Sequence, residues 1–260
     1  MKSKFCIMIP IYKEELDCTE ELSLKRLYKL IKGKNYPLFF VKPQSLNTKN
    51  YYKIIDKKDI RELNFDDKYF EDIHGYSQLC LSYDFYNSVN YDYMYIYQLD
   101  CYLIEDKLNE WCEFGFDYIG GPILSTGAGW DTLDKETQKW EPMVGNGGFS
   151  LRKIETFKEL TDPEGEFRKH YNVDDELINK VIYEDKYFCN DLLNFYDLNM
   201  PNWIVASKFA WDMNVDLYKK IFNIDYLPIV PTKDFCTVYL WPTLAPSTSS
   251  SSLGGFSSTI

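Results

Sequence analysis

The chain has 260 residues, of which 45% are hydrophobic, and a formal net charge of −11. This length and apolar content suit one α/β domain of the larger kind. The negative charge argues against a nucleic-acid-binding protein and against docking to anionic lipid through a polybasic patch, because both need a basic surface. Peripheral membrane contact of another kind stays open.

The first hundred residues alternate expected strands and helices. Apolar runs predict strands over Phe5–Pro10, over Leu38–Val41 and within Lys57–Leu63. Asp17 stands three residues before Glu20, which is the spacing of a capping box at the start of a helix. The apolar face of that helix would carry Leu22, Leu27, Leu30 and Ile31, and Gly33 would end it. A helix over Ser77–Ser88 and a buried strand over Tyr93–Gln98 are expected next.

The rest of the chain continues this alternation. Expected helices cover Leu108–Cys112, Lys153–Leu160, Asp174–Ile182 and Asp185–Phe195, and expected strands cover Tyr118–Ile119, Phe149–Leu151 and Trp203–Ala206. The pattern predicts an α/β fold with a mainly parallel central sheet that is flanked by helices. Residues 125–141 form a long connection, and such loops are usually functional or mobile. The Ser/Thr/Gly-rich residues 243–260 predict a disordered tail after one domain over residues 1–242.

Targeting and zinc-binding signals are absent from the sequence. Its seven cysteines are scattered and show no zinc spacing or disulfide framework. The apolar N-terminal segment is too short for a signal peptide, and no stretch has the length of a transmembrane segment, so a cytoplasmic protein is expected. The two histidines, His74 and His170, do not support a Ser-His-Asp or Cys-His hydrolase.

Asp100 follows the buried strand expected over Tyr93–Gln98. In open α/β sheets, ligands bind beyond the carboxyl ends of the strands. Asp100 is therefore either a turn residue or a ligand of a metal ion or a ribose. Mn²⁺ and Mg²⁺ favour carboxylate oxygens and keep waters and substrate phosphates in their shell, so one protein carboxylate can suffice.

Gly145, Asn146, Gly147 and Gly148 form a glycine-dense segment. Three glycines in four positions permit positive φ and a close approach of the backbone to a ligand. The segment is not a P-loop, and a tight turn before a strand is the plain alternative. A loop that lines a sugar or acceptor pocket fits better, with Asn146 as a hydroxyl partner. Arg152, which follows this segment, is the favoured partner of a phosphate.

Glu184 and Asp185 are adjacent carboxylates at the start of an expected helix. They could simply complement the helix dipole. Alternatively, one of them is a general base that takes a proton from an acceptor hydroxyl. Nearby aromatic residues, including Tyr187, could raise the carboxylate pKa by desolvation and stack against a sugar.

These motifs together resemble the DUF5672 family of glycosyltransferase-like proteins over roughly residues 5–226. The resemblance rests on IPIYK (Ile9 to Lys13), QLD (Gln98 to Asp100), DYIGGP (Asp117 to Pro122), GNGGFSLR (Gly145 to Arg152) and EDKYF (Glu184 to Phe188), with E-x-S-L at Glu21 to Leu24 and Phe85-Tyr86. It implies one GT-A type domain that transfers a sugar from a nucleotide-sugar donor to a glycan or lipid-linked acceptor, with inversion and the help of a divalent cation, Mn²⁺ or Mg²⁺.

The resemblance also implies roles for individual residues. Asp185 would be the catalytic base, with Glu184 placing the acceptor or the helix start. The donor would contact Pro10, Tyr12, Gln98, Asp100 and Arg152, and Asp100 would bind the metal. The sugar or acceptor would contact Gly145, Asn146, Gly147, Gly148 and Tyr187.

Two departures from the family pattern leave other classes open. Gln98 takes the place of the first aspartate of a D-x-D motif, and no histidine follows Leu227 and Pro228. A catalytically silent carbohydrate- or partner-binding protein with a GT-A shell is therefore an alternative. A glycoside hydrolase is another, although it needs two carboxyl groups that face each other across the scissile bond.

Overall fold

The computed structural model describes residues 3–123, 143–192, 196–211 and 236–238. The long connection at 125–141, the domain end at 242 and the tail over 243–260 lie outside these residues and stay predictions. Within the described residues, no helix is both long and apolar enough to cross a lipid bilayer.

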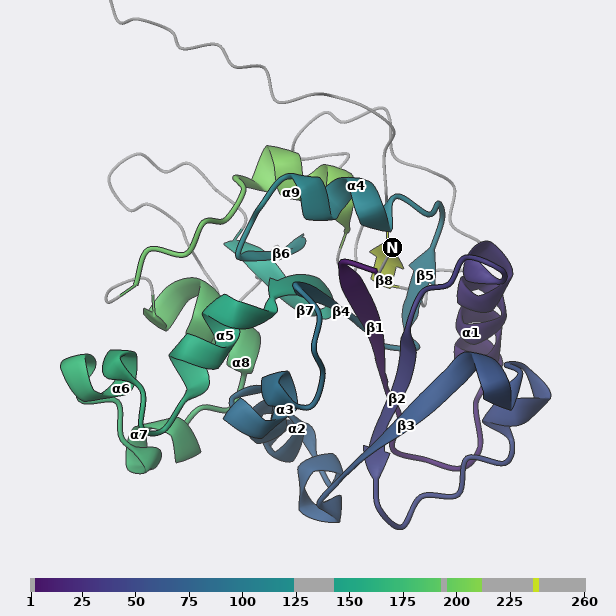
Figure 1. Ribbon diagram of the computed structural model, residues 1–260, viewed down its shortest axis with the longest axis horizontal. Coiled ribbons are helices and arrows are strands. Elements are labelled where there is room, and N and C mark those ends of the chain that lie inside the picture. The colour runs from purple at the N-terminus through teal and green to yellow at the C-terminus, as the bar shows by residue number, and fades with distance from the viewer. Residues whose placement is uncertain (1–2, 124–142, 193–195, 212–235, 239–260) are drawn as a thin grey trace, which may run out of the picture.

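A six-stranded sheet forms the centre of the protein (Figure 1). Its order is β3-β2-β1-β4-β7-β6, with β1 at Phe5–Pro10, β2 at Leu38–Pro43, β3 at Ile60–Phe65, β4 at Tyr93–Tyr97, β6 at Tyr118–Ile123 and β7 at Met143–Lys153. The first four strands of this order pair in parallel, whereas β7 runs antiparallel to β4 and β6. A separate parallel pair joins β5 (Cys101–Leu103) and β8 (Cys236–Val238). The expected mainly parallel α/β sheet is confirmed.

Helices cover both faces of this sheet (Figure 1). One face is packed by α1 (Cys18–Ile31), the 3₁₀ turn η1 (Tyr51–Lys53), α4 (Leu108–Glu113) and α9 (Trp203–Phe209). The other face is packed by α2 (Ile73–Cys80), α3 (Tyr83–Asn87), α5 (Ile154–Thr161) and the π-helical turn η4 (Tyr187–Asp191), which continues the short α8 (Glu184–Lys186). The small helices α6 (Glu166–Tyr171) and α7 (Asp175–Asn179) lie at the left-hand end in Figure 1, and α1 lies at the right-hand end.

Strand β1 shows how the sequence makes this two-sided core. Its side chains alternate between the faces, as they must in a strand. Ile7 and Ile9 pack with the α1 side, and Cys6 and Met8 pack with the α2 side, all of them buried. A continuous apolar run is therefore what a strand covered on both faces requires.

The expected capping box at the start of α1 is confirmed. The Asp17 side chain accepts hydrogen bonds from the backbone N–H of Thr19 and Glu20, and the Glu20 side chain accepts from the Asp17 N–H. Leu22 is 39% exposed, so its expected place on the apolar face is wrong. Leu24 faces the core instead.

Several other expectations about elements are wrong. Trp203–Ala206 belongs to α9 and not to a strand, and the Asn202 side chain caps this helix by accepting from Val205 N–H at 3.0 Å. Residues 77–88 form parts of two helices, because Ser82 caps a new one. The segment Gly145–Gly148 is not a loop or a turn but the middle of β7.

Candidate active site

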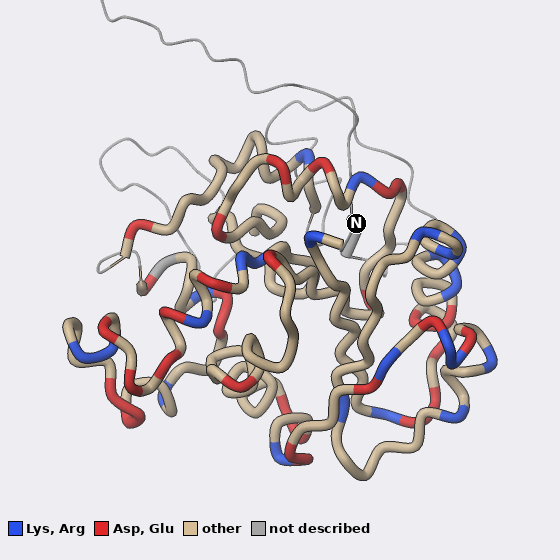
Figure 2. Tube along the Cα trace, in the orientation of Figure 1, with Lys and Arg blue, Asp and Glu red and all other residues tan. Residues whose placement is uncertain are grey.

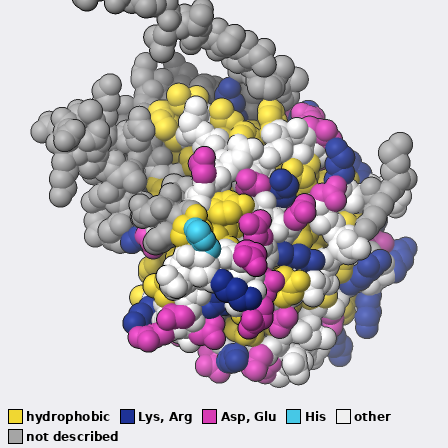
Figure 3. All heavy atoms as spheres, turned by 60° about the vertical axis from the view of Figure 1, so that its left-hand side comes forward, with side chains coloured by type: hydrophobic (Ala, Val, Ile, Leu, Met, Phe, Trp, Pro, Cys, Tyr) yellow, Lys and Arg dark blue, Asp and Glu magenta, His cyan; other side chains and the backbone are white. Residues whose placement is uncertain are grey.

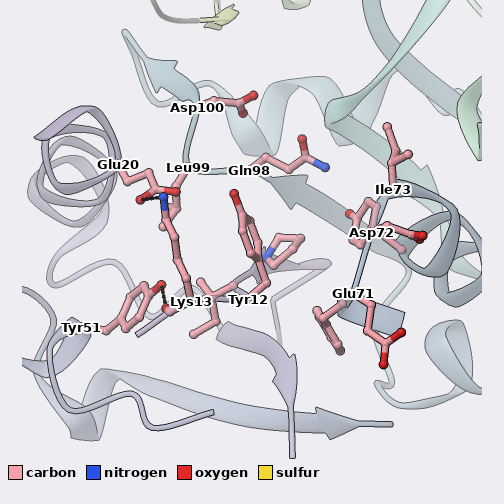
Figure 4. A pocket seen from close by; sticks show the side chains of 14 residues that line it. Tyr12, Lys13, Glu20, Tyr51, Glu71, Asp72, Ile73, Gln98, Leu99 and Asp100 are labelled. Carbon is pink, nitrogen blue, oxygen red and sulfur yellow. Dashed lines mark hydrogen bonds and ion pairs between the residues drawn. The ribbon is translucent and has the colours of Figure 1, made fainter. Parts of the chain in front are cut away.

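A cavity of about 420 Å³ opens beyond the carboxyl ends of β1 and β4 (Figure 4). It is lined by Pro10, Ile11, Tyr12, Lys13, Glu20, Tyr51, Phe70, Glu71, Asp72, Ile73, Tyr76, Gln98, Leu99 and Asp100. This edge of an open α/β sheet is where ligands bind. Four of the five residues predicted to bind the donor, namely Pro10, Tyr12, Gln98 and Asp100, therefore surround one cavity.

Apolar and aromatic side chains make up most of the cavity wall, and its charged side chains are mainly acidic. Lys13 is the cation that lines it, and its Nζ lies 2.9 Å from a carboxylate oxygen of Glu20. Three further carboxylates, those of Glu71, Asp72 and Asp100, also line the cavity. A diphosphate would meet unfavourable charge there unless a cation came with it.

Tyr12 gives the cavity an accessible aromatic surface. Its side chain is 61% exposed although it closely follows β1, in which every residue but Pro10 is buried. In Figure 4 it stands between Lys13 and Gln98. An exposed ring in a cavity wall can stack on a planar base or on the apolar face of a sugar.

Gln98 and Asp100 occupy the turn that follows β4. The Gln98 backbone N–H donates to Gly148 O at 2.9 Å, which fixes this turn against β7. Among the described residues, no three His, Cys, Asp or Glu side chains form a ready-made metal site. The exposed Asp100 carboxylate and the Gln98 side-chain oxygen are nevertheless ligand types that Mg²⁺ and Mn²⁺ accept, with waters and phosphates completing the shell.

The glycines of β7 allow side chains from other elements to approach the strand closely. A Cβ atom on Gly148 would lie 2.8 Å from Gln98 Oε1, and one on Gly147 would lie 2.8 Å from Glu184 Oε1. Contacts this short force a neighbour to move. These glycines are therefore needed for packing between Gln98, β7 and α8.

Asp185 lies against the same strand. Its carboxylate accepts hydrogen bonds from the backbone N–H of Gly147 at 3.3 Å and of Lys186 at 2.7 Å. Burial raises the pKa of Asp185 to about 7, and the negative charge of the neighbouring Glu184 adds to the rise. A carboxylate that titrates near neutral pH and stays partly exposed is suited to proton transfer.

Glu184 and Arg152 form a buried ion pair beneath Asp185. The Arg152 side chain is fully buried, and its Nη2 lies 3.0 Å from Glu184 Oε1. Arg152 also donates to Tyr86 Oη at 2.9 Å and to Ser150 Oγ at 3.2 Å. Arg152 is therefore not among the residues that line the cavity, and a donor phosphate would have to displace Glu184 to reach it.

Helix α2 lies between the cavity and this ion pair. The sequence did not reveal this role of α2. Tyr76 lines the cavity, while the hydroxyl of the next residue, Ser77, donates to Glu184 Oε2 at 3.2 Å and to Ile182 O at 2.8 Å. Ser77 lies 107 positions from Glu184 in sequence, so no local pattern could have paired them.

The other residues predicted to contact the sugar have mixed positions. Asn146 is partly exposed, and its Oδ1 accepts from Gly148 N–H at 3.0 Å. Gly145 packs against Cys189, and Tyr187 is 8% exposed and contacts the Phe188 ring edge to face. Asn146 and Gly148 thus remain beside Gln98, whereas Gly145 and Tyr187 belong to the packing of η4.

The fold is that of GT-A glycosyltransferases of known structure. The galactosyltransferase LgtC with donor and acceptor sugar analogues matches with a TM-score of 0.54 and 12% identity, over 91% of this chain and 87% of LgtC. Mouse xyloside xylosyltransferase 1 gives 0.52 and 13%, over 76% and 84% of the two chains. Core-mannan synthase A from Aspergillus fumigatus, in its Mn/GDP form, gives 0.50 and 12%, over 74% and 70%.

At such identities these similarities show the fold alone. No curated protein matches the chain. A model of the family described as "Protein of unknown function (DUF5672)" matches residues 59–228, which is more than half of the sequence. The chain therefore belongs to the DUF5672 family.

Proposed function

We propose that the protein transfers a sugar from a nucleotide-sugar donor to a hydroxyl group of a glycan or lipid-linked acceptor. The observation that carries this proposal is the short connection between the cavity and Asp185. Gln98 lines the cavity and packs against Gly148, and the adjacent Gly147 N–H binds the Asp185 carboxylate. Gln98, which lines the cavity, and Asp185, which does not, therefore contact neighbouring residues of one strand, and this supports the proposal.

The donor would occupy the cavity, with its planar base or sugar against Tyr12 and its diphosphate toward Gln98 and Asp100. Because four carboxylates and one lysine line the cavity, a divalent cation held by Asp100 and the Gln98 side-chain oxygen would neutralise the diphosphate when bound. Pro10 would shape the wall where β1 ends.

Asp185 would act as the general base. It takes the proton of the acceptor hydroxyl as that oxygen forms a bond to the anomeric carbon. The bond between the anomeric carbon and the diphosphate oxygen breaks, and the nucleoside diphosphate leaves with the electron pair. Attack from the face opposite the diphosphate inverts the configuration at this carbon.

Glu184 and Arg152 would act through Asp185 and touch neither substrate. Both side chains are buried and paired with each other, with Ser77 and with Tyr86. The pair joins α8 to β7 next to the Gly147 N–H that holds Asp185. We therefore assign Glu184 and Arg152 to positioning, in place of the acceptor and donor contacts that the family resemblance implied.

The test is nucleotide release from UDP-, GDP-, CDP- and dTDP-sugars, with and without Mn²⁺ and with candidate acceptors. We expect one donor to be turned over in a cation-dependent reaction, and Asp185→Asn to lower turnover by about 10²–10⁴-fold at unchanged donor affinity. Full activity of Asp185→Asn would contradict the assigned base. Donor binding without turnover would instead identify a carbohydrate-binding protein, and cleavage of a preformed glycan would identify a hydrolase.

A further inference from the structure

The charge of the protein is unevenly distributed along the sequence. Residues 18–61 contain eleven Lys and Arg but only four Asp and Glu, a net charge of +7. Because the whole chain has a net charge of −11, the residues outside this segment carry a net charge of −18. Charges further apart than about 8 Å are largely screened at physiological ionic strength, so a local surface and not the sum decides what it attracts.

Most of these cations gather on one exposed surface. We define the basic face as Lys25, Lys29, Lys32, Lys34, Lys49, Lys53, Lys57, Lys58 and Arg61, all of which are exposed. Six of them lie in α1, in η1, in the 3₁₀ turn η2 (Lys57–Asp59) and at the start of β3, whereas Lys32 and Lys34 follow α1 and Lys49 precedes η1. Tyr28 Oη of α1 bonds to Asp59 at 2.5 Å, which shows that α1 and η2 are neighbours. Figure 2 shows Lys and Arg, interspersed with Asp and Glu, along the backbone on the right-hand side, where α1 lies.

Few carboxylates neutralise the basic face. Lys25, Lys32 and Lys34 pair with Glu21, Asp56 and Asp106. No ion pair with a described carboxylate involves Lys29, Lys49, Lys53, Lys57, Lys58 or Arg61. Two carboxylates lie among these six cations: Asp59 is in the same turn as Lys57 and Lys58, and the charge of Glu62 interacts with that of Lys57. The cations outnumber these two carboxylates, which leaves a positive balance for an anionic partner.

The opposite end of the molecule is acidic. Residues 162–176, which include α6, contain six Asp and Glu but two Lys and Arg. Figure 3 shows acidic side chains on the side where α6 and α7 lie, mixed with Lys, Arg, hydrophobic and uncharged ones. A flat anionic surface can touch the basic end alone, whereas a long polyanion that wraps the protein would also meet the acidic end.

The kind of cation also favours a lipid surface. Eight of the nine cations are lysines, which act as mobile point charges suited to a diffuse anionic surface, whereas bidentate recognition of bases favours the planar fork of arginine. We propose that the basic face docks the protein onto a bilayer that contains anionic lipid. The expectation from net charge, that no polybasic patch would serve this purpose, is thereby revised.

Docking in this way would place α1 and η1 against the lipid headgroups. Glu20 of α1 and Tyr51 of η1 line the cavity, and three cations of the basic face, Lys25, Lys29 and Lys53, lie in the same two elements. If the proposed transfer holds, an acceptor carried by a membrane lipid would then be presented beside the site. The docking itself does not depend on that chemistry.

The test is co-sedimentation of the full chain with vesicles of phosphatidylcholine, with and without phosphatidylglycerol. Lys29, Lys53, Lys57 and Lys58 are changed together to Gln. The control changes Lys68, Lys158, Lys169 and Lys180 to Gln, which alters the net charge equally but away from the basic face. Thermal unfolding of both variants checks that these surface changes leave the fold intact.

We expect the wild type to bind only the anionic vesicles, and high salt to release it. The basic-face variant should lose about tenfold or more in partition coefficient, and the control less than about twofold. Equal loss in both variants, or no binding of the wild type at low salt, would overturn the proposal. Preferential binding of the same face to duplex RNA would assign it to nucleic acid instead. The assay needs no donor or acceptor, so its failure leaves the proposed transfer untouched.

Discussion

Burial gives Asp185 an ionisation unlike that of a surface aspartate. Its pKa is raised to about 7, first by desolvation and then by the charge of Glu184, whereas the pKa of the Asp17 carboxylate is lowered by hydrogen bonds from the start of α1. A carboxyl group whose pKa is higher in the folded state than in the unfolded state favours folding in its protonated form. Asp185 therefore costs stability at the pH where it would serve as a base.

This ionisation predicts how Asp185→Asn changes stability. The contribution of the protonated Asp185 is complete below about pH 4, the unfolded pKa, and is lost as the pH rises through about 7. Since Asn cannot ionise, the variant should gain free energy of unfolding relative to wild type as the pH rises from 5 to 8, by roughly 2–3 kcal/mol. Urea unfolding at the two pH values measures this gain. Asp17→Asn is the control and should show none.

Replacing Asp100 tests whether donor binding requires a divalent cation at this position. Because its exposed carboxylate stands at an acidic cavity, Asp100→Asn should abolish the dependence of donor affinity on Mn²⁺ and lower that affinity about tenfold or more. Isothermal titration with nucleotide, with and without Mn²⁺, is the measurement. Asp106→Asn serves as the control, because Asp106 pairs with Lys34 away from the cavity. Metal-dependent binding that survives in Asp100→Asn would place the cation elsewhere.

At the scale of elements, β7 joins the two halves of the site. Gly147 meets α8, and Gly148 meets Gln98 after β4. The two glycines are adjacent, yet a methyl group on each would disturb a different element. This division predicts two separable phenotypes.

Gly147→Ala should mainly destabilise the fold, because its Cβ would lie 2.8 Å from Glu184 Oε1 and 3.2 Å from Arg152 Nη2. Overpacking of this kind typically costs about 1–3 kcal/mol. Gly148→Ala should mainly weaken donor binding, because its Cβ would displace the Gln98 amide at a partly exposed position. Denaturant unfolding and donor titration of both variants would separate the two effects. If both variants lost the same stability and the same donor affinity, the predicted division between the two glycines would be wrong.

The ion pair between Arg152 and Glu184 predicts strong coupling between β7 and α8. Arg152→Met leaves the Glu184 carboxylate buried without its cation, which typically costs about 3–5 kcal/mol. The double variant Arg152→Met/Glu184→Leu removes both charges and should be less destabilised than Arg152→Met alone. A double-mutant cycle by urea unfolding measures this coupling. Additive effects would show that the two side chains do not depend on each other.

At the scale of the whole molecule, local patterns predicted the elements better than the contacts between them. The strand over Phe5–Pro10 and the capping box at Asp17 were predictable because they depend on residues within one element. The short apolar run Trp203–Ala206 is ambiguous between strand and helix, and Asn202 at its start was the overlooked cap.

The candidate site was predictable in its residues but not in its pairings. Gln98 packs against Gly148 and Asp185 accepts from the Gly147 N–H, but Asp185 does not line the cavity, so its role as the base stays a prediction. The glycines suggested a turn, because the sequence around them does not show the side chains that require them. Those side chains approach β7 from distant parts of the chain. Arg152 was interpreted as a phosphate partner for the same reason, since its partner Glu184 lies 32 positions away.

The separation of charge between the basic face and the α6–α7 end makes the protein an electric dipole. A protein with a pI of about 4.8 is negatively charged at pH 7 and would ordinarily not be retained by a cation exchanger. A resin bead, however, touches one end of a molecule at a time, so we expect retention on both cation and anion exchangers at low ionic strength. Changing Lys29, Lys53, Lys57 and Lys58 to Gln should abolish retention on the cation exchanger but not on the anion exchanger. The basic end of one molecule would also attract the acidic end of another. Low ionic strength should therefore promote reversible head-to-tail association of this acidic protein.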